Sequence, residues 1–218
     1  SPEANDADPF SQSGWQTIAE HTGRVCSQLD EILAEIGSAD ADVLRLAARW
    51  HDRGKAHPSF LAKLKPDALA TARAVNLGHD DFPAKAPPAA WVKGRNPNEN
   101  YRRHFRHELA SALAVLMIPD DRMTSGLRDL AAYVIAAHHG KVRLSIRSLP
   151  EEKTPPGNLR FARGVWDGDV LPETDLGGGV NAAAIHLSLE PMELGLCEHR
   201  PFEGQPSWAD RMLRLRDE

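Results

Sequence analysis

The chain has 218 residues, of which 41% are hydrophobic, and its formal net charge is −5. This length and composition suffice for one sizeable core. Cys26 and Cys197 are too few and too far apart for a disulfide scaffold, and the longest apolar stretch, Leu109–Ile118, is too short to cross a bilayer. We therefore expect a cytoplasmic protein with no membrane anchor. The negative charge gives no general sign of a nucleic-acid binder, although basic residues gather in 93–106 and 141–147.

The first part of the chain is predicted to form a tail and two helices. Residues 1–14 are polar and contain proline, so we expect a poorly ordered N-terminus. Apolar residues then recur at helical spacing over Trp15–Ile36, which predicts an amphipathic helix. A second helix, with Asp40 as its N-cap, is predicted to end beside His51 and Asp52.

Prolines and glycines predict the breaks in the middle of the chain. We expect a short helix that starts at Pro58 and mostly loop over Pro66–Asn100. Two further helices are predicted over Tyr101–Ile118 and Met123–His139, because apolar residues again repeat at helical spacing there. Beyond residue 141 this periodicity is lost, so we expect a loop-rich segment or a small β elaboration.

Imidazole and carboxylate side chains accompany several of these predicted helices. The candidate metal ligands are His21, His51, Asp52, His107, His138 and His139. Such ligands together suit divalent manganese, iron, nickel or cobalt, and a carboxylate can bridge two ions. Neighbours on a helix point about 100° apart, so His51 and Asp52 can serve one centre only at a helix end, with Asp52 as the bridge. Residues from four helices can build such a dinuclear site. Two ions are a common means of breaking phosphodiester bonds, so the pattern predicts a metal-dependent phosphohydrolase.

Other polar residues near these ligands carry a weaker signal. Lys55 follows Asp52 by three residues and is predicted to neutralise charge on a phosphoryl oxygen, with a surface lysine as the alternative. His104 shares a predicted helix face with His107 and is a secondary ligand candidate. The histidines placed outside the site are His57, His79, His186 and His199.

The ordered series EHTGRV, WHDRGKAH, RHE and AAHHGK resembles the HD-superfamily nuclease domain of the CRISPR-associated helicase–nuclease of type I systems. The resemblance covers about residues 21–141, and its specificity comes from the order of the motifs rather than from the HD dipeptide alone. It implies a mainly α, HD-superfamily helical bundle with the elaboration after residue 141. We expect residues 15–218 to form one HD nuclease domain that belongs to a larger protein.

The resemblance also implies metal-dependent cutting of single-stranded DNA. Cutting would follow recruitment to a target-bound, RNA-guided surveillance complex, with a fused or separate superfamily-two helicase supplying the strand. One ion is assigned to His21, His51 and Asp52. The second ion is assigned to Asp52, His107, His138 and His139. Lys55 would assist at the phosphate.

In the family pattern, an aspartate on a late helix completes the first ion's ligands. Asp210, in SWADRM, is the candidate with a similar context in this sequence. Alternatively, Trp208–Glu218 resembles the helix before the closing one, and the aspartate then lies beyond residue 218. We expect the second arrangement, and therefore weak binding of the first ion and reduced nuclease activity.

The identity of the metal and two other functions stay open. Manganese, iron, nickel and cobalt are candidates, with magnesium as a further one, at one or two ions per chain. One alternative function is an HD phosphohydrolase acting on nucleotides or cyclic dinucleotides, which would need a closed pocket. The other is a metal-poor docking module for the surveillance complex. The basic segments beside the histidines favour an open groove and hence a nuclease.

Overall fold

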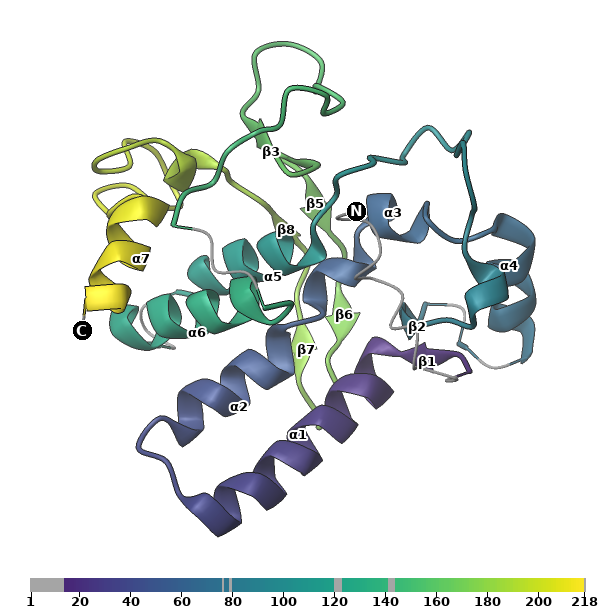
Figure 1. Ribbon diagram of the computed structural model, residues 1–218, viewed down its shortest axis with the longest axis horizontal. Helices are drawn as coiled ribbons and strands as arrows, with labels where there is room; N and C mark the ends of the chain where they lie inside the picture. The colour runs from purple at the N-terminus through teal and green to yellow at the C-terminus, as the bar shows by residue number, and fades with distance from the viewer. Residues whose placement is uncertain (1–13, 76, 79, 120–122, 141–143, 218) are drawn as a thin grey trace.

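The computed structural model describes residues 14–75, 77–78, 80–119, 123–140 and 144–217, and the predicted disorder of residues 1–14 falls almost wholly outside them. The chain is mainly helical, as predicted (Figure 1). Its α-helices are α1 (Ile18–Ile36), α2 (Ala41–Trp50), α3 (Pro58–Leu61), α4 (Pro66–Val75), α5 (His107–Leu116), α6 (Ser125–Ala137) and α7 (Trp208–Asp217). Short 3-10 turns are η2 (Arg53–Ala56), η3 (Pro88–Ala90) and η4 (Glu190–Met192). None of the helices in these ranges has the length and apolar character needed to span a membrane.

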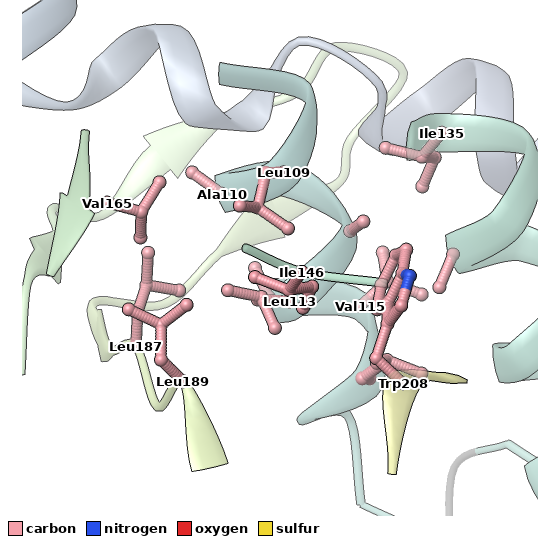
Figure 2. Close-up of a cluster of buried hydrophobic side chains, with 14 of the residues drawn as sticks. Leu109, Ala110, Leu113, Val115, Ile135, Ile146, Val165, Leu187, Leu189 and Trp208 are labelled. Atoms are coloured by element: carbon pink, nitrogen blue, oxygen red, sulfur yellow. The ribbon is translucent and has the colours of Figure 1, made fainter. Parts of the chain in front are cut away.

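Helix α5 is the centre of the core, because all ten of its residues are buried. Helix α6 packs along α5, α2 packs against α6, and α1 and α2 form a helical hairpin (Figure 1). A helix that is apolar on every side needs cover on every side. Part of that cover comes from the chain after residue 144: Figure 2 shows Ile146, Leu187, Leu189 and Trp208 in one cluster with side chains of α5. The late segment is therefore part of the same core.

The strands form antiparallel pairs of two strands each. The pairs in the described chain are β1 (Gln16–Thr17) with β2 (Pro83–Lys85), β3 (Phe161–Ala162) with β4 (Val165–Trp166), β5 (Val170–Leu171) with β8 (Ile185–His186), and β6 (Thr174–Asp175) with β7 (Asn181–Ala182). The last two pairs are successive parts of one long hairpin, because β5 leads into β6 and β7 leads into β8. This hairpin and β3–β4 are the small β elaboration that was expected after residue 141.

The long hairpin is fixed against the helices at both its middle and its tip. Arg53 is fully buried, and its guanidinium donates to Thr174 Oγ1 at 2.6 Å and to the Ala183 carbonyl at 3.1 Å. At the tip, Gly177 has a φ of +78°, and a Cβ added there would lie 2.5 Å from the Ala19 carbonyl oxygen of α1. Glycine is therefore required by backbone conformation and by the closeness of α1.

One helix was missed by the sequence prediction of loop over residues 66–100. Pro66–Val75 forms α4. Proline suits the first position of a helix, because the N–H that it lacks would have no intrahelical partner there. The remainder of the stretch is mostly irregular, with β2 and η3 as its short regular parts.

The predicted helix over Tyr101–Ile118 is shorter than expected, because α5 begins only at His107. Arg106 is extended, with φ −111° and ψ 103°, and its N–H donates to the Arg163 carbonyl of the β3–β4 turn at 2.9 Å. A long-range backbone contact thus replaces the first helical turns. As a result His104 does not share a helical face with His107, and the secondary ligand role predicted for it lacks its basis.

A buried carboxylate, Asp169, ties the loop after α2 to the β elaboration. Its carboxylate accepts hydrogen bonds from both terminal nitrogens of Arg102, at 2.6 and 2.9 Å, and from the Trp166 backbone N–H, at 2.7 Å. His57 Nε2 lies 3.4 Å from the same carboxylate, and because its Nδ1 accepts the Ser59 N–H, Nε2 carries the ring proton. His57, which the sequence placed outside the site, is only 3% exposed. Its structural partner is the Asp169 carboxylate.

Replacing Gly54 with alanine should destabilise the protein by backbone collision. A Cβ at this position would lie 2.2 Å from the His107 carbonyl oxygen, and the backbone of α5 cannot move aside easily. We expect a loss of free energy of unfolding at the upper end of the roughly 1–3 kcal/mol typical of overpacking, measured by urea denaturation. Gly126→Ala, in the first turn of α6 with open space around it, is the control and should be neutral or stabilising by up to about 1 kcal/mol. Equal effects of the two substitutions would contradict the packing described.

Replacing Asp169 with asparagine should destabilise the protein in a pH-dependent way. Burial raises the pKa of Asp169, but hydrogen bonds from His57 and Arg102 outweigh it and lower the pKa below its ordinary value of 3.8. A lowered folded-state pKa stabilises the fold above the ordinary value, and this stabilisation is lost as the pH falls through the folded-state pKa. We expect a loss of about 3–5 kcal/mol near pH 7, and a smaller difference from wild type below about pH 4. The exposed Asp42→Asn serves as control and should change little at either pH.

Candidate metal centre

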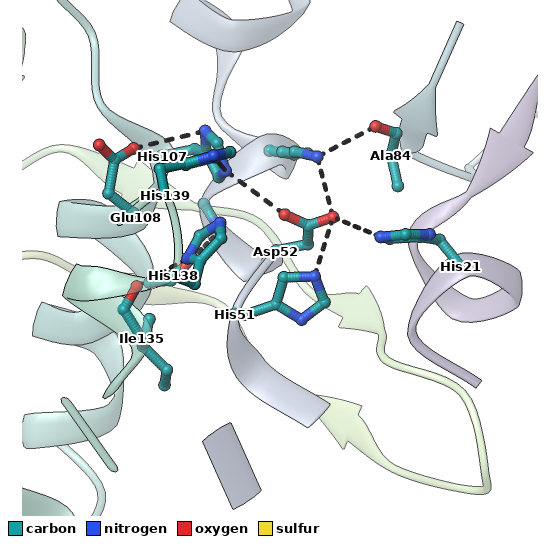
Figure 3. A network of polar contacts seen from close by, with 12 residues as sticks. His21, His51, Asp52, Ala84, His107, Glu108, Ile135, His138 and His139 are labelled. Atoms are coloured by element: carbon teal, nitrogen blue, oxygen red, sulfur yellow. Dashed lines mark hydrogen bonds and ion pairs between the residues drawn. The ribbon is translucent and has the colours of Figure 1, made fainter. Parts of the chain in front are cut away.

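Four helices bring the six predicted ligands to one place (Figure 3). The contributing segments are α1 with His21, the end of α2 with His51 and Asp52, the start of α5 with His107, and the end of α6 with His138 and His139. They form two groups, each with potential ligand atoms within 4.8 Å of one another: His21, His51 and Asp52 in one, and His107, His138 and His139 in the other. The sequence resemblance assigned the first group to one ion and the second group, together with Asp52, to the other.

Asp52 belongs to the first group, also faces the second, and is 1% exposed. Its Oδ2 atom faces His21 Nε2 at 3.4 Å, His51 Nε2 at 3.3 Å and Lys55 Nζ at 2.9 Å. Its Oδ1 atom faces the other group, with His107 Nε2 at 3.4 Å. Each oxygen of one carboxylate is therefore directed to a different set of imidazoles, which is the arrangement of a bridging ligand.

Helix ends orient two of the imidazole rings. His51 Nδ1 lies 2.8 Å from the Ala48 carbonyl, and His138 Nδ1 lies 2.7 Å from the Ile135 carbonyl. Carbonyls in the last turn of a helix have no N–H partner within it, so they are available as acceptors. Because a carbonyl can only accept, Nδ1 carries the proton in both rings when they are neutral. This leaves the Nε2 lone pair for a metal ion.

The charges of His21, His138 and Asp52 suit metal binding at neutral pH. Burial lowers the pKa of His138 to about 3 and that of His21 to about 4, so both imidazoles are neutral. Burial also lowers the pKa of His51, but the Asp52 carboxylate outweighs it and the net shift is upward. Burial raises the pKa of Asp52, whereas Lys55 and His51 outweigh it and hold that pKa well below its ordinary value. Ionised carboxylate and neutral imidazole are the forms that bind metal ions.

The donor atoms fit a divalent transition metal. With Nδ1 protonated, the Nε2 lone pair of His51 faces a carboxylate oxygen 3.3 Å away, and two electron-rich atoms this close need a proton or a metal cation between them. The buried Asp52 Oδ1 also accepts no hydrogen bond of ordinary geometry from the residues that the structure describes. A buried carboxylate oxygen in this condition is costly unless a cation binds it. Nitrogen and oxygen ligands of this kind suit manganese, iron, cobalt or nickel.

Lys55 is fixed inside the centre. Its ammonium donates to Asp52 Oδ2 at 2.9 Å and to the Ala84 carbonyl of β2 at 3.1 Å, and the residue is only 6% exposed. The alternative of a surface lysine is therefore wrong. Lys55 supplies a positive charge directly beside the Asp52 carboxylate.

Asp210, the candidate for an additional ligand, caps a helix instead. It lies in the first turn of α7, where its carboxylate accepts the Ser207 hydroxyl at 2.6 Å and its N–H donates to Ser207 Oγ at 3.1 Å. Neither group of potential ligands in the described chain includes it. The serine and aspartate three residues apart are typical of a helix start, and this local signal is sufficient to explain them.

One acidic residue beside the centre was absent from the sequence prediction. Glu108 follows His107, is 6% exposed, and has its Oε2 atom 3.6 Å from His107 Nδ1 (Figure 3). The available signal was chemical: Glu108 is the one carboxylate in helix α5, most of whose residues are apolar. A carboxylate in such a helix is rarely buried without a partner.

Comparison with known proteins gives one match. The family model described as "Cas3, HD domain" matches residues 13–169, more than half of the chain. All six clustered ligands lie within the matched segment, and Asp210 lies outside it. Searches of curated proteins and of solved structures give no match.

Loss of a single imidazole should weaken metal binding sharply. We expect the wild-type chain, stripped with a chelator and titrated with Mn²⁺ by calorimetry, to bind one or two ions. His51→Ala and His138→Ala should each weaken binding by more than the roughly 10–100-fold that accompanies loss of an outer partner. His186→Ala, on an exposed strand outside the cluster, should bind as wild type does. No uptake of manganese, iron, cobalt or nickel by folded wild-type protein would contradict the assignment.

Proposed function

Because this chain belongs to the family of Cas3 HD domains, metal-dependent nucleases of type I CRISPR systems, we propose that it hydrolyses phosphodiester bonds of single-stranded DNA. The site of hydrolysis is the dinuclear centre of the two imidazole groups. His21, His51 and Asp52 hold one ion there, and Asp52, His107, His138 and His139 hold the other. Residues 15–218 act as one HD nuclease domain, in line with the packing of the late segment into the same core.

The observation that carries this proposal is the position of Asp52. Its two oxygens face separate sets of imidazoles, and burial removes the competition of water for both oxygens. A carboxylate with one oxygen for each of two ions is a natural bridge. A site for a single ion would leave one of these oxygens buried against imidazole lone pairs.

The residues of the chain divide the catalytic work. When two ions are bound, they supply Lewis-acid stabilisation of phosphoryl oxygens and lower the pKa of water. Asp52 and the imidazoles fix the separation and orientation of the donor atoms before substrate arrives. Lys55, held between Asp52 and Ala84, presents an ammonium that stabilises negative charge developing on the phosphate.

Single-stranded DNA is favoured over nucleotides by the surroundings of the centre. The basic segment 93–106 leads directly into His107. Its Arg102 and Arg106 are paired with Asp169 and Glu108, so the charge that would attract a phosphate backbone is that of the exposed Lys93 and Arg95. The large cavity of ≈ 640 Å³ elsewhere on the molecule has none of the six ligands in its lining. Its acidic lining residues are Asp80, Asp81, Glu173 and Asp175. Arg73 is the basic residue among those that line it. The excess of carboxylates disfavours a phosphate-bearing nucleotide there, so this cavity does not support the nucleotide alternative.

The expected partners follow from the family. A superfamily-two helicase, fused or separate, supplies the single strand, and an RNA-guided surveillance complex bound to its target recruits the nuclease. Magnesium remains a further candidate for the ions, beside manganese, iron, nickel and cobalt. Under this proposal the domain hydrolyses single-stranded DNA, and its docking to the surveillance complex brings it to that substrate.

Circular single-stranded DNA is the substrate that tests this proposal. With Mn²⁺, the protein should convert circular single strands to linear and shorter products, and excess EDTA should stop the reaction. Asp52→Asn removes one negative charge and the bridge, so we expect a loss of activity of at least about 100-fold, read as the initial rate on a denaturing gel. His186→Ala serves as the matched control and should retain the wild-type rate.

Three results would contradict the proposal. Wild-type rates in Asp52→Asn protein would point to a contaminating nuclease. Hydrolysis of nucleotides or cyclic dinucleotides, without cutting of DNA, would favour the phosphohydrolase alternative. Metal-free protein that binds the surveillance complex but cuts nothing would favour a docking module.

A further inference from the structure

Glu108 is a buried charge that the proposed catalytic scheme does not use. Its side chain is 8% exposed, in the first turn of α5, where all residues are buried. A carboxylate in such surroundings is costly unless other charged or polar groups compensate it. Two groups do so: Arg106 Nη1 lies 3.3 Å from Oε1, and His107 Nδ1 lies 3.6 Å from Oε2. Figure 3 shows Glu108 on the side of the His107 ring that faces away from Asp52.

The position of His107 explains why a carboxylate is present. His51 and His138 lie at the C-terminal ends of their helices, where backbone carbonyls accept from Nδ1. His107 begins α5, and a helix start presents N–H groups, which cannot accept a proton from a ring nitrogen. At this one helix end a side chain must therefore provide the acceptor.

The geometry fixes what the acceptor achieves. With Arg106 beside it, the Glu108 carboxylate faces Nδ1 and favours the ring form that carries its proton there. His107 Nε2 then presents a lone pair to the centre, where it lies 3.4 Å from Asp52 Oδ1 and 3.3 Å from His139 Nε2. The distance of 3.6 Å between Glu108 Oε2 and His107 Nδ1 is longer than an ordinary hydrogen bond. Because both atoms are shielded from bulk water, solvent only weakly screens the attraction between the carboxylate and the ring N–H.

We infer that Glu108, held by Arg106, is a positioning residue that sets the tautomer and orientation of the His107 ring for metal binding. This inference rests on the metal centre of the proposed function and extends it to a residue that does not itself touch the ions. Carboxylates that orient metal-binding imidazoles are worth about 10–100-fold in metal affinity. The charge of Arg106 places the carboxylate, so its loss should have a smaller effect in the same direction.

The first test is the tautomer of His107 in metal-free wild-type protein, read from long-range ¹H–¹⁵N NMR correlations of the imidazole ring. We expect the proton on Nδ1. In Glu108→Ala protein we expect a mixture that includes the form protonated on Nε2. A wild-type ring protonated on Nε2 would overturn the inference, and this measurement needs neither a variant nor nuclease activity.

The second test is Mn²⁺ affinity, measured by calorimetry on chelator-stripped protein. Glu108→Ala should bind at least one ion about 10–100-fold more weakly, and Glu108→Gln should lose less, because its amide oxygen still places a partial negative charge opposite Nδ1. Glu190→Gln is the matched control, because Glu190 is also a buried glutamate, at 3% exposed. Its carboxylate accepts hydrogen bonds from the backbone N–H groups of Glu198 and His199, away from the centre. It should leave Mn²⁺ affinity unchanged even where it lowers the melting temperature.

The outcomes separate this inference from the proposed function. Unchanged Mn²⁺ affinity in folded Glu108→Ala protein would overturn the inference while leaving the nuclease intact. If Glu108→Ala does not fold, Glu108→Gln and the wild-type tautomer decide. If folded wild-type protein binds none of manganese, iron, cobalt and nickel, the proposed function fails, and the metal-free tautomer still reports whether Glu108 orients the ring.

Discussion

The burial of one ionised carboxylate governs this structure. Asp52 is 1% exposed and is surrounded by imidazoles and one ammonium. Removing a carboxylate from water costs several kcal/mol unless charges and hydrogen bonds compensate it. Lys55 compensates part of this cost directly, and the converging Nε2 atoms complete a cavity suited to cations. The rest of the fold serves to hold those groups around Asp52.

Helix ends are the means by which the fold orients the rings. At the C-terminal ends of α2 and α6, backbone carbonyls accept from the Nδ1 atoms of His51 and His138. At the start of α5 the available backbone groups are donors, and Glu108 takes the acceptor's place beside His107. For these three rings an acceptor on the Nδ1 side is therefore supplied by backbone at a helix C-terminus and, under our inference, by a side chain at a helix start.

The turn that follows α2 is held from several sides, and the β elaboration provides two of them. Gly54 packs against the α5 backbone, and its N–H donates to Ser111 Oγ at 2.7 Å. Arg53 reaches the long hairpin, and His57 reaches Asp169 beside the β3–β4 hairpin. The segment after residue 144 thus supports the loop that carries Asp52 and Lys55, and it also covers α5. This explains why a small and irregular β region accompanies a helical metal centre.

The sequence by itself determined the helical class, most helix positions and the six side chains that meet at the centre, because hydrophobic spacing and ligand chemistry are local properties. Their roles as ligands stay predictions. Tertiary structure decided where α5 begins, since the Arg106 N–H donates to the Arg163 carbonyl, 57 positions further along the chain, rather than within a helix. It likewise decided the partner of His57, which is Asp169. Such residues depend on which distant group lies opposite them, and no local pattern encodes that distance.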